Sequence, residues 1–362
     1  MNDSVPISRH AIDPDLAASS NATAAVQEGS LFYPTFQNPT FSLPEPIDYP
    51  HAGAGADEDE AALEALWEYG AGLRGPAAAQ WRRQVRALYR RGIPLETTLQ
   101  FLYAGRPSRQ AFRAWLAERG RPPPAGQASP DWPQDDVLSA AQRAFWDRDG
   151  YLVLPGAASP GQCAAARQAI WDFLGASAAD PSSWYRDHPG KRGVMLDFYD
   201  HPALAAIRNL PAVRRACQQL YGTRALHPSI DKAGFNPPEA PGWEFPGSPL
   251  HWDASLCLPM PFKLQGLLYL GDCGPLDGAF HCVPGFHRRL PDWLARVPPG
   301  IHPRDWALRD LDPVPVPGRA GDFVLWHQAL PHCGSPNRGA LPRMVHYLTY
   351  LPDTIDEQAE WI

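Results

Sequence analysis

The sequence predicts a mainly β domain with flanking helices, preceded by a small N-terminal helical subdomain. Beyond residue 225, short apolar segments alternate with Gly- and Pro-rich connections, which is typical of a sandwich or jelly-roll barrel. Four segments between residues 60 and 120 place apolar residues three and four apart, as amphipathic helices do. The 42 prolines, roughly twice the usual share, favour irregular connections over a helical bundle.

Composition excludes several classes of protein. The 362 residues can bury one large domain and a smaller one. A formal net charge of −7 argues against a surface that binds nucleic acid or anionic membranes. The sequence has no apolar run of membrane-spanning length, no secretory signal and no CxxC pair among its six cysteines. We therefore expect a cytoplasmic protein with reduced thiols.

The first 120 residues divide into two parts. Residues 1–58 are rich in Ala, Ser, Pro and Asp without a sustained period, which predicts a flexible arm. Residues 59–120 predict the helical subdomain, whose last helix Ser108 could cap. Arginines gather in its second helix, at positions 82, 83, 86, 90 and 91. They form either a solvated helix face or a binding surface for an anionic partner. The helical segment as a whole could also dock a carrier protein or another protein partner.

A Pro-rich linker at 121–135 leads into the main domain, 136–362. This domain opens with a helix (SAAQRAFWDRDG), a strand (YLVLPG) and a second helix (SPGQCAAARQAIWDFLGA). The strands that follow are expected in SIDKAGF, FKLQGLLYLGD, GAFHCVPG, GDFVLWH and RMVHYLTYL.

The stretch LHWDAS, residues 250–255, carries a candidate pair of metal ligands. His251 and Asp253 alternate with Trp252, so both side chains point to one face of an extended segment. A third ligand would complete a 2-His-1-carboxylate triad, the set that holds Fe(II) on one face and leaves open positions. The segment GDFVLWHQALPHCGSPN offers two candidates, His327 and His332.

Arg343 begins the strand pattern RMVHYLTY. An arginine that points into a barrel is costly unless it meets a carboxylate, and its planar fork suits one. A metal triad followed by such an arginine therefore suggests 2-oxoglutarate, whose keto-acid end binds iron while its far carboxylate pairs with the guanidinium.

These motifs, in this order, resemble the phytanoyl-CoA dioxygenase family of Fe(II)- and 2-oxoglutarate-dependent oxygenases. HWD, DGAFHCVPGFHRR, GDFVLWHQALPHCGSPN and Arg343 carry the resemblance, with FWDRDGYLVLPGAASPGQC at its start. It covers roughly residues 136–352. The resemblance implies a double-stranded β-helix (jelly-roll, cupin-like) core, Fe(II) as metal, 2-oxoglutarate as co-substrate and dioxygen as oxidant.

The resemblance also implies residue roles. In the family the arginine follows the distal histidine by eleven residues, which fits His332 and not His327. We therefore expect His251, Asp253 and His332 to bind the metal and carry catalysis, and Arg343 to bind 2-oxoglutarate. His327 is then a structural strand residue or a substrate contact.

Further positions are expected near the co-substrate. Strand alternation places Gln265 and Tyr269 on one face, together with Lys263 and Leu267. Tyr269 matches an aromatic residue that family members place beside 2-oxoglutarate, although core packing explains it as well. Gln265 and Lys232 are the other candidates, Lys232 with an ion pair as its alternative. Six further residues are expected in lesser roles: Asn337 as a turn residue, His281 and His287 at the barrel mouth, and Trp252, Phe262 and Trp326 as an apolar rim.

The implied reaction is hydroxylation of an unactivated C–H bond in a small molecule, either amino-acid-like or a natural-product intermediate, with release of succinate and CO2. Related halogenases replace the carboxylate ligand by Gly or Ala, and Asp253 is retained here. The alternative is a cupin-type metal-binding protein, an isomerase or sensor, that does not consume 2-oxoglutarate.

Overall fold

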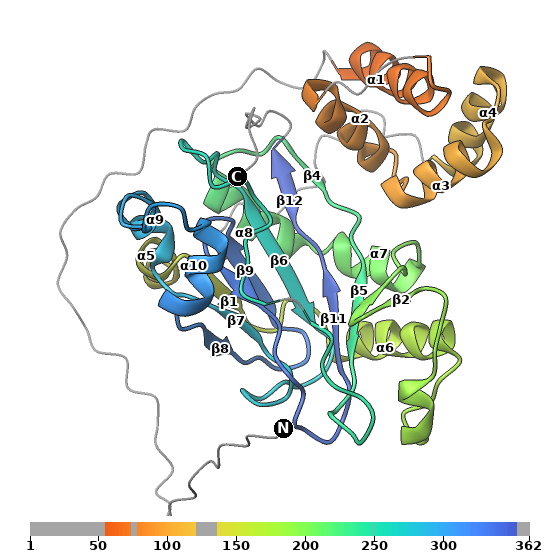
Figure 1. Cartoon of the computed structure of the whole chain (residues 1–362). Coiled ribbons are helices and arrows are strands. Elements are labelled where there is room, and N and C mark those ends of the chain that lie inside the picture. The colour runs from red at the N-terminus through yellow and green to blue at the C-terminus, as the bar shows by residue number, and fades with distance from the viewer. Residues whose placement is uncertain (1–54, 74–77, 121–135, 248, 353–362) are drawn as a thin grey trace, which may run out of the picture. The chain divides into compact units, whose positions relative to one another are not determined.

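The computed structural model describes residues 55–73, 78–120, 136–247 and 249–352 (Figure 1). Most of the expected arm and all of the expected linker at 121–135 lie outside these residues. Within them the structure has the predicted fold class: a mostly antiparallel β core with flanking helices, and helices at the N-terminal side. None of the helices in the described ranges is long and apolar enough to cross a membrane.

Four helices make up the N-terminal helical unit: α1 (Gly55–Gly70), α2 (Ala78–Arg90), α3 (Leu95–Gly105) and α4 (Arg109–Arg119). Apolar residues three and four apart give each helix one buried stripe. The stripes meet in a shared core that includes Leu63, Leu66, Leu88, Leu102 and Phe112. The Ser108 hydroxyl accepts a hydrogen bond from the Ala111 N–H, so the predicted cap of α4 is confirmed.

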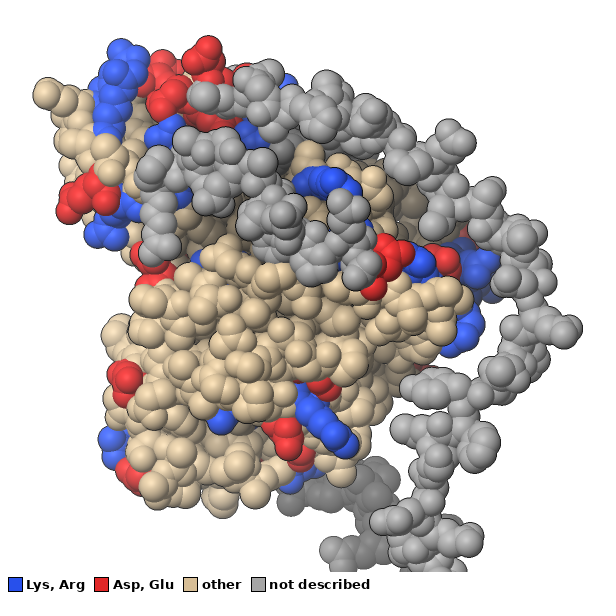
Figure 2. All heavy atoms as spheres, turned by 180° about the vertical axis from the view of Figure 1, so that it is seen from behind, with Lys and Arg blue, Asp and Glu red and all other residues tan. Residues whose placement is uncertain are grey.

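The arginines of α2 lie against acidic residues of α1. Asp59 accepts hydrogen bonds from Arg86 at 3.5 Å and Arg90 at 3.1 Å, and Arg91 pairs with Glu60. These contacts fit a solvated, ion-paired helix face. On the face seen in Figure 2, basic and acidic side chains are interspersed, and no large positive patch appears among the described residues.

The main domain opens with the predicted helix, strand and helix: α5 (Ala140–Asp149), β1 (Tyr151–Leu154) and α6 (Pro160–Leu174). Both helices begin with a capping box, in which a serine and the glutamine three residues later bond each other's backbone N–H. Gly150 ends α5 at φ +73°, a conformation that lets the chain turn directly into β1.

The larger sheet has seven antiparallel strands in the order β1–β9–β6–β11–β5–β3–β2. Its further strands are β9 (Phe323–His327), β6 (Leu264–Tyr269), β11 (Arg343–Tyr347), β5 (Ala233–Asn236), β3 (Met195–Leu196) and β2 (Lys191–Arg192). A second sheet, ordered β10–β7–β8, consists of β10 (His332–Cys333), β7 (Phe280–Cys282) and β8 (Val314–Val316).

The expected strand RMVHYLTYL is interrupted, and a short strand that was not expected lies directly before SIDKAGF. β4 (Leu226–Pro228) is separate from β5, and β12 (Tyr350–Pro352) from β11, and β4 and β12 pair with each other. The cause is Ser229. Its N–H donates to the Thr349 carbonyl, and its hydroxyl accepts from the Thr349 N–H at 2.9 Å, which replaces a regular ladder bond. The chain between β4 and β5 and the chain between β11 and β12 are therefore interrupted at facing positions, Ser229 and Thr349.

Alternation along the strands of the large sheet separates two cores. On β9, Phe323 and Leu325 face a core shared with α6, α7 (Pro202–Arg208) and α8 (Pro211–Tyr221). Val324 and Trp326 face the other core, which joins the sheet to β7, β8, α9 (Phe286–Leu294) and α10 (Pro303–Asp310). This second face, between the two sheets, is where the candidate site forms.

Candidate active site

His251, Asp253 and His332 converge as the sequence predicted. One ligand atom from each residue lies within 4.8 Å of the others. Asp253 Oδ1 is 3.5 Å from His251 Nε2, and Asp253 Oδ2 is 3.3 Å from His332 Nε2. His327, the other candidate, is not part of this group. Two imidazoles and one carboxylate form the donor set of a facial triad for Fe(II), so these residues fit that metal.

The backbone holds the two histidines directly beside each other. The His251 N–H donates to the His332 carbonyl at 3.0 Å, and the His332 N–H donates to the His251 carbonyl at 2.9 Å. Arg304, on α10, donates to the Trp252 and Ala254 carbonyls, both at 2.7 Å. These two carbonyls flank Asp253, so Arg304 fixes the backbone on both sides of the acid. No sequence motif pointed to Arg304, because it is distant in the chain.

Hydrogen bonds also set the state of each imidazole. His251 Nδ1 lies 2.8 Å from the Pro249 carbonyl, and His332 Nδ1 lies 3.1 Å from the Leu330 carbonyl. A carbonyl oxygen only accepts, so each Nδ1 carries a proton and donates it. The Nε2 atoms face Asp253, where each can share a proton with the carboxylate, and a metal ion would take the place of that proton.

The charges at this cluster favour an ionised acid. Hydrogen bonding to His251 and His332 holds the pKa of Asp253 well below its usual range. Burial opposes protonation of His251, yet the bond to Asp253 raises the pKa of that imidazole. The Asp253 side chain is 56% exposed, whereas that of His332 is 7% exposed. The cluster is thus buried on one side and open on the other, which leaves room for a co-substrate.

Gln265 contacts the Asp253 carboxylate. Its Nε2 donates to Asp253 Oδ2 at 2.7 Å, and its Oε1 accepts from the Trp326 indole N–H at 3.0 Å. The sequence interpretation had placed Gln265 against the co-substrate. In the structure both halves of its amide are engaged within the protein, on the Asp253 carboxylate and on a buried indole.

Arg343 is a buried cation with an unused donor. It is 5% exposed, and its Nε donates to the Gly278 carbonyl at 2.8 Å. Its Nη1 has no hydrogen-bond partner among the described residues. A Cβ at Gly234 would lie 3.5 Å from Nη1, and one at Gly334 would lie 3.8 Å from Nη2. A Cβ at Gly234 would also lie 2.8 Å from Val345 Cγ2, so the two glycines let the backbone approach the guanidinium closely. Gly334 is only two residues beyond His332.

The surroundings of Arg343 keep it charged. Burial would lower its pKa, but the neighbouring Tyr347 and Tyr269 phenols and the Cys273 thiol raise it. A buried, ionised guanidinium with a free N–H is the group that binds a carboxylate in bidentate fashion. The residues present therefore fit the far end of 2-oxoglutarate.

Two of the expected co-substrate contacts have other partners. The Tyr269 hydroxyl donates to the Val316 carbonyl at 2.7 Å and accepts from the Phe280 N–H at 3.0 Å. Its proton is therefore already donated within the protein, and any contact of Tyr269 with 2-oxoglutarate would involve the ring. Lys232 Nζ lies 2.8 Å from Asp197 Oδ1, the ion pair that had been its alternative role.

His327 and Asn337 have hydrogen-bond partners within the protein, and His287 lies beside His327. His327 Nδ1 accepts from the Ala329 N–H at 2.9 Å, and burial lowers the pKa of His327 to about 3. The ring of His287 on α9 lies 5.3 Å from that of His327, and His281 lies on β7. Asn337 is fully buried and donates to the Asn236 and Leu341 carbonyls, in keeping with the predicted turn role.

The aromatic residues near the motifs do not form the expected apolar rim. Trp252 and Trp326 are buried in the core between the sheets, and the Trp252 indole donates to the Ala329 carbonyl. Phe262 packs on the His327 ring and on the helix-side core. Large rings at these positions fill the interior, because both strand faces of the large sheet are covered.

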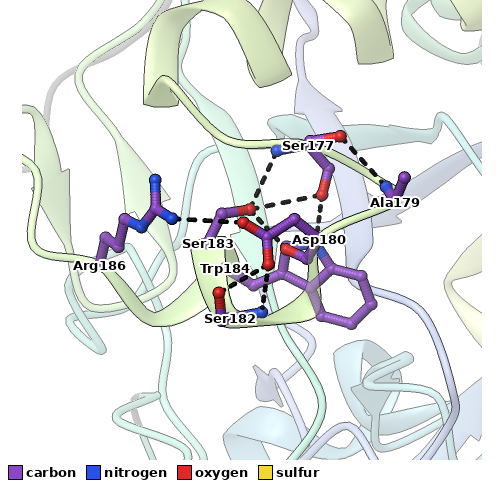
Figure 3. A network of polar contacts seen from close by, with 7 residues as sticks. All are labelled: Ser177, Ala179, Asp180, Ser182, Ser183, Trp184 and Arg186. Carbon is purple, nitrogen blue, oxygen red and sulfur yellow. Dashed lines mark hydrogen bonds and ion pairs between the residues drawn. The ribbon is translucent and has the colours of Figure 1, made fainter.

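A surface groove of about 470 Å³ lies between the loop after η1 (Pro181–Tyr185) and the segment that runs into His251. It is lined by Tyr185, Asp187, His188, Pro189, Lys191, Gly193, Trp243 and Pro246. A polar network fixes η1: Asp180 accepts from Ser182 and Arg186, and the Trp184 indole donates to the Ser177 carbonyl (Figure 3). One wall of the groove is therefore held firmly.

Comparisons with known proteins agree with these features. Residues 146–345 match the family model described as phytanoyl-CoA dioxygenase (PhyH). A Dictyostelium discoideum protein named as a phytanoyl-CoA dioxygenase is 22% identical over 58% of this chain and 74% of its own length. The ectoine dioxygenase of Sphingopyxis alaskensis is 25% identical over 70% of this chain and 86% of its own length.

Two solved structures are also similar. The non-heme α-ketoglutarate-dependent carbocyclase SnoK from nogalamycin biosynthesis has a TM-score of 0.44 at 21% identity, covering 60% of this chain and 85% of its own. The EctD structure from S. alaskensis has a TM-score of 0.43 at 20% identity, covering 61% and 80%. The family match spans more than half of the sequence. The chain therefore belongs to the phytanoyl-CoA dioxygenase family and is an Fe(II)- and 2-oxoglutarate-dependent dioxygenase.

Proposed function

We propose that this enzyme hydroxylates an unactivated C–H bond of a small molecule. In that reaction the substrate C–H, dioxygen and 2-oxoglutarate become C–OH, succinate and CO2. The observation that carries the proposal is the arrangement of His251, Asp253 and His332 within 4.8 Å of one another, with an unpaired donor of Arg343 beside the same segment of chain.

In this proposal His251, Asp253 and His332 hold the metal through two Nε2 atoms and one carboxylate oxygen. Iron in such a site supplies the activation of dioxygen. The protein supplies fixed ligands: the paired backbone bonds of His251 and His332, and the carbonyls that hold each Nδ1 proton. Asp253 as a ligand distinguishes the site from that of a halogenase, which lacks this carboxylate.

Arg343 binds the far carboxylate of 2-oxoglutarate in the proposal. The guanidinium is buried and charged, and its Nη1 has no hydrogen-bond partner among the described residues. The Phe245 ring also lies near Gly334, with its Cζ 3.1 Å from where a Cβ at 334 would be. This ring would exclude water from that end of the co-substrate.

The groove lined by Tyr185 and Trp243 supports an amino-acid-like or natural-product substrate. It offers a half-buried cation, Lys191, a carboxylate, Asp187, and the rings of Tyr185 and Trp243. Opposite charges with aromatic walls suit a small molecule that carries polar groups on an apolar frame. The segment with Trp243 and Pro246 continues to His251, so a ligand there would contact the chain that leads to the metal.

The test is product analysis under isotopically labelled dioxygen. The purified protein, Fe(II) and 2-oxoglutarate are incubated with a panel of amino acids and natural-product scaffolds, and products are identified by mass spectrometry. The expected result is one labelled oxygen in a hydroxylated product and one in succinate. Asp253→Ala is the matched control and is expected to give neither. Product that gains no oxygen, or full turnover by Asp253→Ala, would contradict the proposal.

A further inference from the structure

Asp253 is the most exposed of the three proposed metal ligands, and one side chain restrains its outer oxygen. Gln265 Nε2 donates to Asp253 Oδ2 at 2.7 Å. An exposed carboxylate without such a restraint can rotate about its last bond and change how many oxygens it offers to a metal. The hydrogen bond from Gln265 therefore limits the orientations in which the Asp253 carboxylate can face a metal ion.

The amide of Gln265 is itself oriented by Trp326. These two residues are directly paired across β6 and β9, and the indole N–H donates to Gln265 Oε1 at 3.0 Å. An indole N–H only donates, so the oxygen of the amide must face it and the NH2 group must face Asp253. The amide has one orientation that satisfies both neighbours.

Trp326 is rigid enough for this task. It is 3% exposed, its ring lies 4.3 Å from the Phe280 ring, and it lies 5.2 Å from the His332 ring. The same indole thus packs against one proposed ligand and, through Gln265, orients another. A fixed donor is what a metal site requires of the residues behind its ligands.

We infer that Gln265, oriented by the Trp326 indole, is a positioning residue that holds the Asp253 carboxylate for metal binding. This inference rests on the proposed metal site, because it assigns Asp253 as a ligand. It predicts that Trp326 acts on the metal through Gln265, rather than only by filling the core.

The test measures binding of Mn(II) or Co(II) to the metal-free protein by calorimetric titration, without turnover. Gln265→Leu, which keeps the approximate size and removes both hydrogen bonds, is expected to raise the metal Kd about 10- to 100-fold. Trp326→Phe keeps an aromatic ring and removes the N–H, and is expected to raise the Kd by a smaller factor. In the double variant the Kd should equal that of Gln265→Leu, since the two residues act in series.

Two controls separate positioning from general destabilisation. Gln328→Leu changes another buried glutamine, which bonds the Pro261 carbonyl, and is expected to lower Tm without changing the metal Kd. The visible absorption bands of bound Co(II), which report coordination geometry, are expected to change in Gln265→Leu and not in Gln328→Leu.

The outcomes distinguish the inference from the function on which it rests. If Gln265→Leu binds metal within twofold of the wild type with unchanged Co(II) bands, the inference is wrong while the metal site stands. If the effects of Gln265→Leu and Trp326→Phe simply add, the serial arrangement is wrong. If the wild type and Asp253→Ala bind metal equally, the proposed site itself fails.

Discussion

Replacing Arg343 by methionine tests the co-substrate site most directly. The change keeps an unbranched apolar side chain at this buried position and removes the guanidinium. Wild-type Arg343 presents an Nη1 that has no partner among the described residues and an Nη2 that lies near Gly334. A carboxylate bound by the guanidinium can accept one charge-assisted hydrogen bond from each nitrogen.

Each such bond contributes about 1.5 kcal/mol at the lower end of the usual range. Two bonds give about 3 kcal/mol, which corresponds to a Kd for 2-oxoglutarate raised about 150-fold. The assay is titration of 2-oxoglutarate into the metal-loaded protein, with the KM from succinate release as a second measure. Arg343 donates to the Gly278 carbonyl and not to a residue of the triad. The Kd of Mn(II) should therefore stay within a factor of about two of the wild-type value.

Arg208→Met is the matched control. Arg208 is also buried, at 7% exposure, and donates to the Tyr199 carbonyl at 2.9 Å. Its loss should lower Tm and leave the Kd for 2-oxoglutarate unchanged. A 2-oxoglutarate Kd within threefold of the wild type in Arg343→Met would refute the assigned role, as would an equal loss of metal affinity.

Three further predictions concern the site and its scaffold. His332→Ala should abolish metal binding in calorimetric titration while His327→Ala retains it, because only His332 lies with the other ligands; the reverse result would mean that the wrong histidine was chosen. Burial lowers the pKa of His346 to about 3, so the unfolded chain takes up its proton below pH 6.5 and the folded one does not. The free energy of unfolding then decreases as pH falls from 6.5 towards 3. When it is measured by urea unfolding and plotted against pH over this range, the slope for His346→Leu should be shallower than that of the wild type by about 1.4 kcal/mol per pH unit. Gly278→Ala should cost about 1–3 kcal/mol in urea unfolding, because φ is +78° and a Cβ would lie 2.4 Å from Asn236 Nδ2; an unchanged midpoint would contradict this.

The sequence alone was sufficient to predict those features that depend only on the spacing of nearby residues. Alternation put His251 and Asp253 on one face, and the structure brings both to His332. The strand pattern after Arg343 indicated an inward arginine, and its side chain is buried. Helix signals were equally local: the serines that cap α4, α5 and α6 lie directly before each helix.

Features that depend on register between distant strands were not accessible. The contact of Gln265 with Asp253 depends on its pairing with Trp326 across β6 and β9, and nothing in either strand specifies that pairing. Arg304 reaches the metal-ligand segment from a helix fifty residues later. The Tyr269 and Lys232 side chains have protein partners that alternation alone could not identify.

The paired backbone bonds between His251 and His332 separate metal acquisition from folding. In a zinc finger the ion must gather its ligands from a loose chain, so apo protein unfolds. Here sheet formation alone closes the long loop between the two histidines. The entropy cost of that closure is therefore part of the folding free energy and does not reduce the free energy of metal binding. Chelators should therefore strip the metal from a protein that stays folded. Which metal ion is bound would depend on the metals available in the cell. Because nickel, cobalt and zinc bind such sites more tightly than Fe(II), they would displace iron during purification.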